Sequence, residues 1–198
     1  MEKIDLKTRR VYKDRHYQGA NELYGLEDLC KKYIKADMEI VELGCWEGVS
    51  TCLFAYYAKK VHTIDCRDCP ERINAYPNIE YHKGSFDRVL EDWDHESMDL
   101  VYIDGAHDYK SVVADINLVT PLIKRGGYIA GHDYPMNIGD FSKNAGPGVD
   151  RAIRDTLLIE KPVVQVRGGP PQTLQYKPIE FEVFGDSSWV IEIDAVRG

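Results

Sequence analysis

Two short apolar runs in the middle of the chain are each followed by a pair of ionisable side chains. The pairs are Asp104 with His107, and His132 with Asp133. The runs, residues 100–103 and 128–131, are short and partly β-branched, as buried parallel strands are. In open α/β sheets, ligands bind at the carboxyl ends of the strands. We therefore expect the four side chains to converge on one ligand site.

The segment between the two runs has the pattern of a crossover helix. Asp108 is a suitable N-cap. Apolar residues then recur at steps of three and four, as on one buried helical face: Val112, Val113, Ile116, Val119, Leu122 and Ile123. Lys124 and Arg125 suit a last helical turn, and the glycines at 126 and 127 would end the helix. A strand–helix–strand unit makes the two strands parallel, which would bring the two ionisable pairs together.

The rest of the chain alternates in the same way. Further strands are expected at 39–43, 61–64, 79–82, 163–166, 181–184 and 189–193, and helices at 26–35, 49–60, 86–93 and 149–160. This alternation predicts a single α/β domain over residues 1–198, with a mostly parallel sheet and helices on both faces. The last two strands, with no clear helix between them, suggest a closing antiparallel hairpin.

Composition excludes several classes of protein. No apolar run approaches the ~18 residues of a membrane span, and the N-terminus lacks the apolar core of a secretory signal. Five cysteines are an odd number without a disulfide framework, so a cytoplasmic protein is expected. Cys66 and Cys69 form one C-x-x-C without a second pair. They are read as reduced bystanders, with a redox or zinc role as the alternative. The net charge of −8 disfavours nucleic acid as a partner.

Two segments outside the expected helices and strands have compositions that suggest a function. Residues 1–16 carry six Lys/Arg against three Asp/Glu. They form either a solvated, mobile arm or one that folds over the active site or meets an anionic partner. Residues 134–148 contain two prolines and three glycines, and a loop of this length suggests a lid or a substrate loop.

Three signals indicate a nucleotide-like cofactor. The stretch VELGCWEGVST at 41–51 holds Gly44 for a tight turn and Gly48 for close backbone approach at a helix start. Asp65 ends the next strand, where a carboxylate can accept hydrogen bonds from ribose hydroxyls. Ser85 and Phe86 follow the third strand, where an adenine ring can lie. Each signal alone has an ordinary reading as turn or loop chemistry, but their order and spacing together favour a cofactor.

The missing motifs narrow the cofactor. The chain has no P-loop, and Trp46 occupies the place of the second glycine of a dinucleotide fingerprint. A ligand with ribose and adenine but no pyrophosphate is therefore expected, and S-adenosylmethionine fits. The candidate contacts are Glu42, Gly44, Cys45, Trp46, Gly48, Asp65, Ser85, Phe86 and Asp104.

Residues 40–133 resemble class I S-adenosylmethionine-dependent methyltransferases. The E-L-G-x-x-x-G of residues 42–48 is similar to their first motif, and Asp65 falls where their ribose-binding acid falls. IDGAHDY and GGYIAGHD resemble the branch that contains metal-dependent macrolide-sugar O-methyltransferases, with cephalosporin hydroxylase-like relatives. The resemblance implies a seven-stranded sheet of order 3-2-1-4-5-7-6 with the last strand antiparallel.

The resemblance also implies a metal and a base. Asp104 and the residues after the fifth strand, His132 and Asp133, would bind a divalent metal such as Mg²⁺ or Mn²⁺, and His107 would be the general base. The family usually has two acids, or an acid and an amide, after that strand. A histidine there suits Mn²⁺, Fe²⁺ or Zn²⁺ better than Mg²⁺, which leaves the metal open.

The expected function is O-methylation of a small hydroxylated acceptor such as a sugar. Two alternatives stay open: a catalytically silent cofactor-binding protein with a regulatory or assembly role, and a non-methylating enzyme on the same scaffold. Each site residue also has a bland reading, as a turn or cap residue for Asp104 and Asp133, a surface histidine for His107 and a core histidine for His132. Neither the acceptor nor the oligomeric state, a homo-oligomer included, follows from the sequence.

Overall fold

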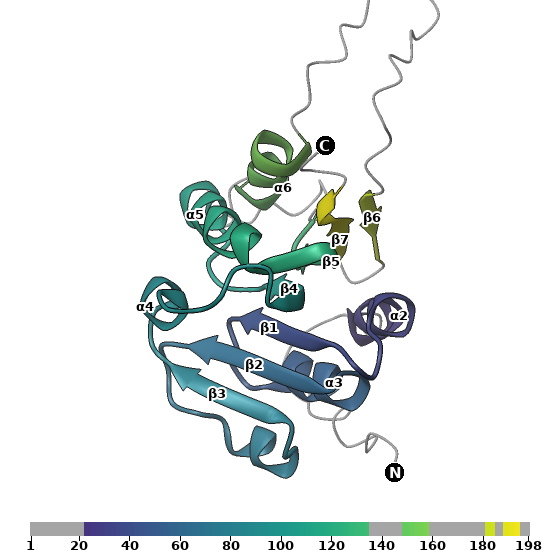
Figure 1. The fold of residues 1–198 in the computed structure, drawn as a ribbon, viewed down its shortest axis with the longest axis vertical. Coiled ribbons are helices and arrows are strands. Elements are labelled where there is room, and N and C mark those ends of the chain that lie inside the picture. Colours follow the sequence, from purple (N-terminus) through teal and green to yellow (C-terminus); the bar gives the residue numbers. More distant parts are fainter. Residues whose placement is uncertain (1–21, 135–147, 159–180, 185–187, 195–198) are drawn as a thin grey trace, which may run out of the picture.

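The computed structural model describes residues 22–134, 148–158, 181–184 and 188–194 (Figure 1). The helices are α2 (Glu22–Tyr33), α3 (Val49–Tyr57), α4 (Phe86–Leu90), α5 (Tyr109–Val119) and α6 (Gly148–Ile153), which continues as the π-helix η3 (Arg154–Leu158). Short 3₁₀ turns are η1 (Glu71–Ala75) and η2 (Thr120–Leu122). The strands are β1 (Glu39–Leu43), β2 (Lys60–Asp65), β3 (Ile79–Lys83), β4 (Met98–Ile103), β5 (Ile123–Gly131), β6 (Phe181–Val183) and β7 (Trp189–Glu192).

One sheet joins these strands in the order β3-β2-β1-β4-β5-β7-β6. The pairs among β1 to β5 are parallel, and β7 runs antiparallel to both β5 and β6. The expected α/β class with a mostly parallel sheet is confirmed, as is the closing antiparallel hairpin. The order reverses between β1 and β4, which places the carboxyl ends of these two strands at the ligand-binding edge of such a sheet.

Helices cover both faces of the sheet (Figure 1). Helices α2 and α3 pack on one face in a core that includes Leu29, Phe54 and Tyr102. Helices α4, α5 and α6 lie on the other face, around Val101, Ile116 and Ile153. Residues of β4 alternate between the two cores because successive side chains of a strand point to opposite faces. Burial on both sides explains why the central strands read as continuous apolar runs.

The end of α5 corrects the sequence prediction. The helix ends at Val119, followed by the 3₁₀ turn that contains Pro121, and Ile123 already begins β5. Proline lacks the N–H that a continuing helix needs. Lys124 is therefore a strand residue, and its Nζ lies 2.8 Å from Asp99 Oδ1 rather than near a helix terminus. The glycines at 126 and 127 lie inside β5, beside the register shift between Met98 and Leu100.

Other boundaries differ by a few residues. Helix α2 starts four residues earlier than expected, and α4 stops at Leu90 instead of continuing to Trp93. The strand expected at 163–166, the basic arm 1–16 and all of the 134–148 loop except its two ends lie outside the described residues. Among the helices that are described, none has the length and apolar character that a bilayer span requires.

Candidate active site

Three side chains gather where β4 and β5 end, as the strand pattern predicted. His107 Nδ1 lies 2.6 Å from Asp133 Oδ2. Asp104 belongs to the same group, since one ligand atom from each of Asp104, His107 and Asp133 lies within 4.8 Å of the other two. The parallel pairing of Ile103 with Gly131 aligns the two strand ends and so brings these loops together.

His132 contacts the group from the other side of Asp133. Its Nδ1 lies 3.1 Å from Asp133 Oδ1, so that two imidazoles share one carboxylate. The loop is held by its backbone, because the His132 N–H donates to the carbonyl of Ile103 and its carbonyl accepts from Trp189 Nε1. Trp189 is buried in the antiparallel strand β7, so the hairpin at the end of the chain supports the site.

Asp133 adopts a left-handed backbone conformation, with φ of 66°. Such a conformation is unfavourable for a residue with a Cβ and is found mainly where the surroundings enforce it. Here it turns the chain sharply after β5 and directs the carboxylate back toward His107. The observed strain at a residue that contacts two histidines is typical of a functional site.

The electrostatics of the pair are reciprocal. Burial alone would raise the pKa of Asp133, but hydrogen bonds from His107 and His132 outweigh it and lower that pKa below its usual range. The hydrogen bond to Asp133 in turn raises the pKa of His107 above 6.5, against the lowering effect of burial. Each group thus stabilises the charged form of the other.

These donors suit a divalent cation. Two carboxylates and one imidazole form the group, and a mixed oxygen and nitrogen set favours Mn²⁺, Fe²⁺ or Zn²⁺ over Mg²⁺. The imidazole is that of His107, whereas the resemblance implied Asp104, His132 and Asp133. His132 contacts Asp133 but does not belong to the group of three, so its role as a ligand stays a prediction.

The glycine turn after β1 lies directly against the end of β4. Gly44 has φ of 97°, and a Cβ there would be 2.1 Å from the carbonyl oxygen of Asp104. Gly48, with φ of 75°, is the N-cap residue of α3, and a Cβ there would be 2.5 Å from Ile73. Both glycines are therefore required by the protein's own packing. At Gly44 the close approach means that the predicted cofactor turn packs directly against the Asp104 loop.

Glu42, one of the predicted cofactor contacts, has its carboxylate turned inward. It is fully buried and accepts hydrogen bonds from the hydroxyls of Ser50, Thr51 and Thr63. Burial raises its pKa to about 7, although these hydroxyls favour the charged form. Glu42 ties β1 to the start of α3 and to β2, and so fixes the turn between them.

Asp65 holds the same turn from the end of β2. Its Oδ2 accepts hydrogen bonds from the backbone N–H groups of Cys45 (3.0 Å) and Trp46 (2.8 Å), and its Oδ1 accepts from that of Arg67 (2.9 Å). Burial opposes ionisation, but these three donors lower its pKa. A carboxylate has about four acceptor positions, so at most one remains for a ligand hydroxyl, on a residue that is only 8% exposed.

The remaining predicted cofactor contacts line the same edge. Trp46 is 49% exposed with φ of 45°, whereas Cys45 is buried. Ser85 is exposed at the start of α4, and the half-buried ring of Phe86 lies where a Cβ on Gly105 would be 2.8 Å away. Trp46, Phe86 and the Asp104 loop therefore follow the carboxyl ends of β1, β3 and β4, at the same edge of the sheet. Cys66 and Cys69 are exposed and free.

Sequence reasoning missed Asp115. Its carboxylate lies on the buried face of α5, 3.6 Å from where a Cβ on Gly105 would be, and burial and Asp108 raise its pKa to about 6. The signal was present, because an acid at position 115 interrupts the apolar face made by Val112, Ile116 and Val119.

Comparisons with known proteins agree with this geometry. Residues 41–134, just under half of the chain, match the model of a family described as "Methyltransferase domain". The matched segment runs from the glycine turn to the loop that follows Asp133, and so spans the whole candidate site. The expected resemblance to class I S-adenosylmethionine-dependent methyltransferases is confirmed by this match and by the shared fold of the structures below.

Solved structures of low sequence identity share the fold. A MycE methyltransferase of the mycinamycin biosynthetic pathway, in complex with Mg and S-adenosylhomocysteine, superposes with a TM-score of 0.60 at 16% identity. The match covers 96% of this chain and 54% of that one, so the chain spans about half the length of this relative. An O-methyltransferase from Bacillus cereus, in complex with S-adenosylhomocysteine, gives 0.59 at 18% identity, over 94% and 89%.

One curated relative is more similar in sequence. An uncharacterized protein of Acanthamoeba polyphaga mimivirus is 27% identical over 177 residues, which covers 81% of this chain and 72% of the relative. Its description names no reaction.

Proposed function

We propose that this chain methylates a hydroxyl group of a small hydroxylated acceptor, such as a sugar, with His107 as the general base. The observation that carries the proposal is the 2.6 Å contact between His107 Nδ1 and Asp133 Oδ2 at the carboxyl ends of β4 and β5. When the imidazole is neutral, a proton on Nδ1 satisfies Asp133 and leaves Nε2 as an acceptor. An oriented histidine of this kind can take the proton of a hydroxyl that attacks the sulfonium methyl.

The cofactor would lie along the glycine turn. The acceptor position left on Asp65 suits a ribose hydroxyl, and Phe86 and Ser85 would contact the adenine ring. Backbone packing around Gly44 keeps this turn next to Asp104. The methyl group would then face the edge where His107 lies, which is the relationship that transfer to a hydroxyl requires.

A divalent metal fits the same edge. Asp104 and Asp133 would hold it as carboxylate ligands, with His132 as the nitrogen ligand if His107 is the base. When bound, it would make an acceptor hydroxyl more acidic. If His107 bound the metal instead, it could not act as the base. The metal affinities of His107→Ala and His132→Gln distinguish these two arrangements.

The acceptor is proposed to be a small molecule rather than nucleic acid, in line with the net charge of −8. The test is release of S-adenosylhomocysteine from S-adenosylmethionine in the presence of a panel of monosaccharides and small diols. We expect turnover with at least one acceptor, loss of that turnover in His107→Ala, and parent activity in His95→Gln, which removes an exposed histidine outside the site.

Two outcomes would contradict the proposal. Calorimetric binding of S-adenosylhomocysteine without turnover of any acceptor would favour the catalytically silent alternative. Full activity of His107→Ala would remove the base and with it the proposed mechanism.

A further inference from the structure

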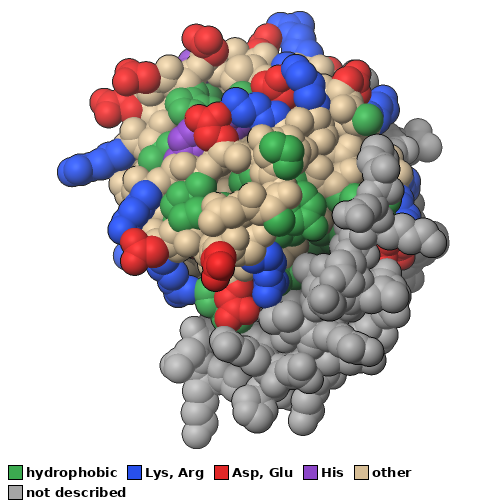
Figure 2. All heavy atoms as spheres, turned by 90° about the horizontal axis from the view of Figure 1, so that it is seen from below, with side chains coloured by type: hydrophobic (Ala, Val, Ile, Leu, Met, Phe, Trp, Pro, Cys, Tyr) green, Lys and Arg blue, Asp and Glu red, His purple; other side chains and the backbone are tan. Residues whose placement is uncertain are grey.

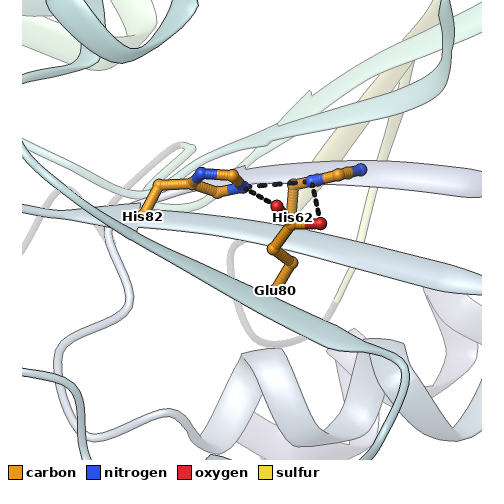
Figure 3. Close-up of side chains that lie close together, drawn as sticks. All are labelled: His62, Glu80 and His82. Atoms are coloured by element: carbon orange, nitrogen blue, oxygen red, sulfur yellow. Dashed lines mark hydrogen bonds and ion pairs between the residues drawn. The ribbon is translucent and has the colours of Figure 1, made fainter.

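A second group of potential metal ligands lies on the outer strands of the sheet, away from the β4 and β5 loops. His62 lies on β2, and Glu80 and His82 lie on the edge strand β3. In the parallel register His62 is the partner of Glu80, and His82 is two residues further along. All three side chains therefore project from the same face of the sheet, and Figure 3 shows them pointing toward one another.

The distances within this group are close to those of a metal centre. His62 Nδ1 and His82 Nε2 are 3.1 Å apart, and each lies 3.7 Å from one oxygen of Glu80. Zinc–nitrogen bonds of about 2.0–2.1 Å place two tetrahedral ligand nitrogens about 3.3 Å apart. Changes of a few tenths of an ångström would thus let all three residues bind one ion.

The surroundings pre-organise the two imidazoles. The ring of Trp93, just after α4, stands edge-on to both, with centroids 4.9 Å from His62 and 5.5 Å from His82. The side chain of His62 is only 10% exposed and that of His82 is 22% exposed, whereas that of Glu80 is 49% exposed. One side of the group is therefore packed against protein and the other is open. Figure 2, which views the molecule from the β3 end of Figure 1, shows histidine atoms at the surface among acidic and basic side chains.

We propose that His62, Glu80 and His82 form a binding site for a first-row transition cation such as Zn²⁺, which links the edge strand β3 to β2. Two imidazoles and one carboxylate are ligands that Zn²⁺ accepts, whereas Mg²⁺ prefers oxygen ligands alone. The open side provides the fourth position for water. Such an ion would add a cross-link between β2 and β3, the pair at one edge of the sheet.

A simpler arrangement accounts for the same contacts without an ion. Lys60 Nζ lies 2.7 Å from Glu80 Oε2, and the two imidazoles share a hydrogen bond. In that case the group is an ion pair beside a histidine pair. The two interpretations give Lys60 different roles. If the group binds a metal, Lys60 competes with the metal for Glu80. If it does not, Lys60 stabilises the group through its ion pair with Glu80.

The test is a Zn²⁺ titration of the full chain after treatment with a chelator, followed by calorimetry and, with Ni²⁺, by tryptophan fluorescence. We expect His82→Gln and Glu80→Gln each to lose one Zn²⁺ per chain or to weaken that binding by more than about tenfold. His95→Gln is the matched control and should bind like the parent. Lys60→Gln should strengthen binding about two- to fivefold, because a competing exposed ion pair is removed.

Tryptophan fluorescence tests whether the ion binds at His62, Glu80 and His82. Bound Ni²⁺ should quench the emission of Trp93, and this part of the quenching should be absent in Trp93→Phe and in His82→Gln. Quenching of Trp189 by an ion at the other group would persist in both variants. This separates the site from the Asp104, His107 and Asp133 group, whose ion would be unaffected by His82→Gln. Unchanged Zn²⁺ stoichiometry and affinity in both His82→Gln and Glu80→Gln would overturn the proposal. If His82→Gln fails to fold by circular dichroism, the more exposed Glu80→Gln decides.

Discussion

The backbone of Gly148 lies so close to His107 that a Cβ on the glycine would be 2.3 Å from the His107 carbonyl oxygen. Helix α6 begins at this point. Its continuation η3 contacts the first residue of α5, just after this loop, through a hydrogen bond of 2.8 Å from the Tyr109 hydroxyl to Asp155. The start of α6 therefore positions the loop that carries the candidate base, although it contributes none of the ionisable groups described there.

Gly148→Ala should displace the His107 loop and lower turnover by up to about 10²-fold, because a shift of this size misaligns a catalytic group. Gly126→Ala is the control for turnover, since an added Cβ there meets nothing within 4 Å; its φ of 70° should cost stability but leave turnover like the parent's. Steady-state kinetics and thermal unfolding of both variants check the prediction. Parent-like turnover in Gly148→Ala would show that α6 moves instead of the loop.

The pH dependence of turnover should report His107. Asp133 raises the pKa of His107 above 6.5. As the pH falls through this raised pKa, the base becomes protonated and the rate falls. Asp133→Asn should move this acid limb to lower pH, since the raising hydrogen bond is lost. His107→Ala should remove the limb and reduce turnover by ~10²–10⁴-fold. Cofactor affinity, measured by calorimetry, should change little in both variants.

Metal dependence separates the roles of the two histidines. Asp104→Asn and Asp133→Asn should raise the metal concentration needed for turnover, because each removes a charged oxygen ligand. His132→Gln should do the same if His132 is the nitrogen ligand, while His107→Ala leaves metal affinity intact. The reverse result for the two histidines would make His107 a ligand. Undiminished methyl transfer after complete chelation would remove the metal from the mechanism.

Asp65→Ala should weaken S-adenosylhomocysteine binding by about 1–3 kcal/mol, through loss of an acceptor for ribose hydroxyls. The structure adds a second effect, because the backbone N–H groups of Cys45 and Trp46 also lose their acceptor. Calorimetry for affinity and denaturant unfolding for stability should both register a loss. Unchanged affinity in a folded variant would refute the ribose assignment.

Glu42 should make stability depend on pH. Its pKa is raised from 4.5 to about 7 in the folded chain, so its contribution is fully present below 4.5 and is lost as pH rises toward 7. The shift corresponds to a difference on the order of 3 kcal/mol between the two ends of this range. Glu42→Gln should flatten this part of the profile, which urea unfolding at pH 5 and pH 8 can measure. Parallel profiles for parent and variant would contradict the burial argument.

The central part of the fold was predictable because its signals are local. Buried parallel strands such as 100–103 read as apolar runs, and Asp108 caps α5 by accepting from the N–H groups of Lys110 and Ser111. The end of α5 was predicted wrongly because the cations at 124 and 125 suit a helix terminus as well as the start of β5. Pro121 is the residue that ends the helix, because it cannot donate a backbone hydrogen bond to the preceding turn.

The sequence by itself determined which strand ends carry Asp104, His107, His132 and Asp133, since alternation and strand order follow from hydrophobic periodicity and crossover handedness. Only the tertiary structure decided what each side chain contacts: His107 with Asp133, Glu42 with buried hydroxyls, and His62 with His82 across β2 and β3. Periodicity specifies the face on which a side chain lies, but a contact of 3 Å depends on register, loop conformation and packing between segments far apart in the chain.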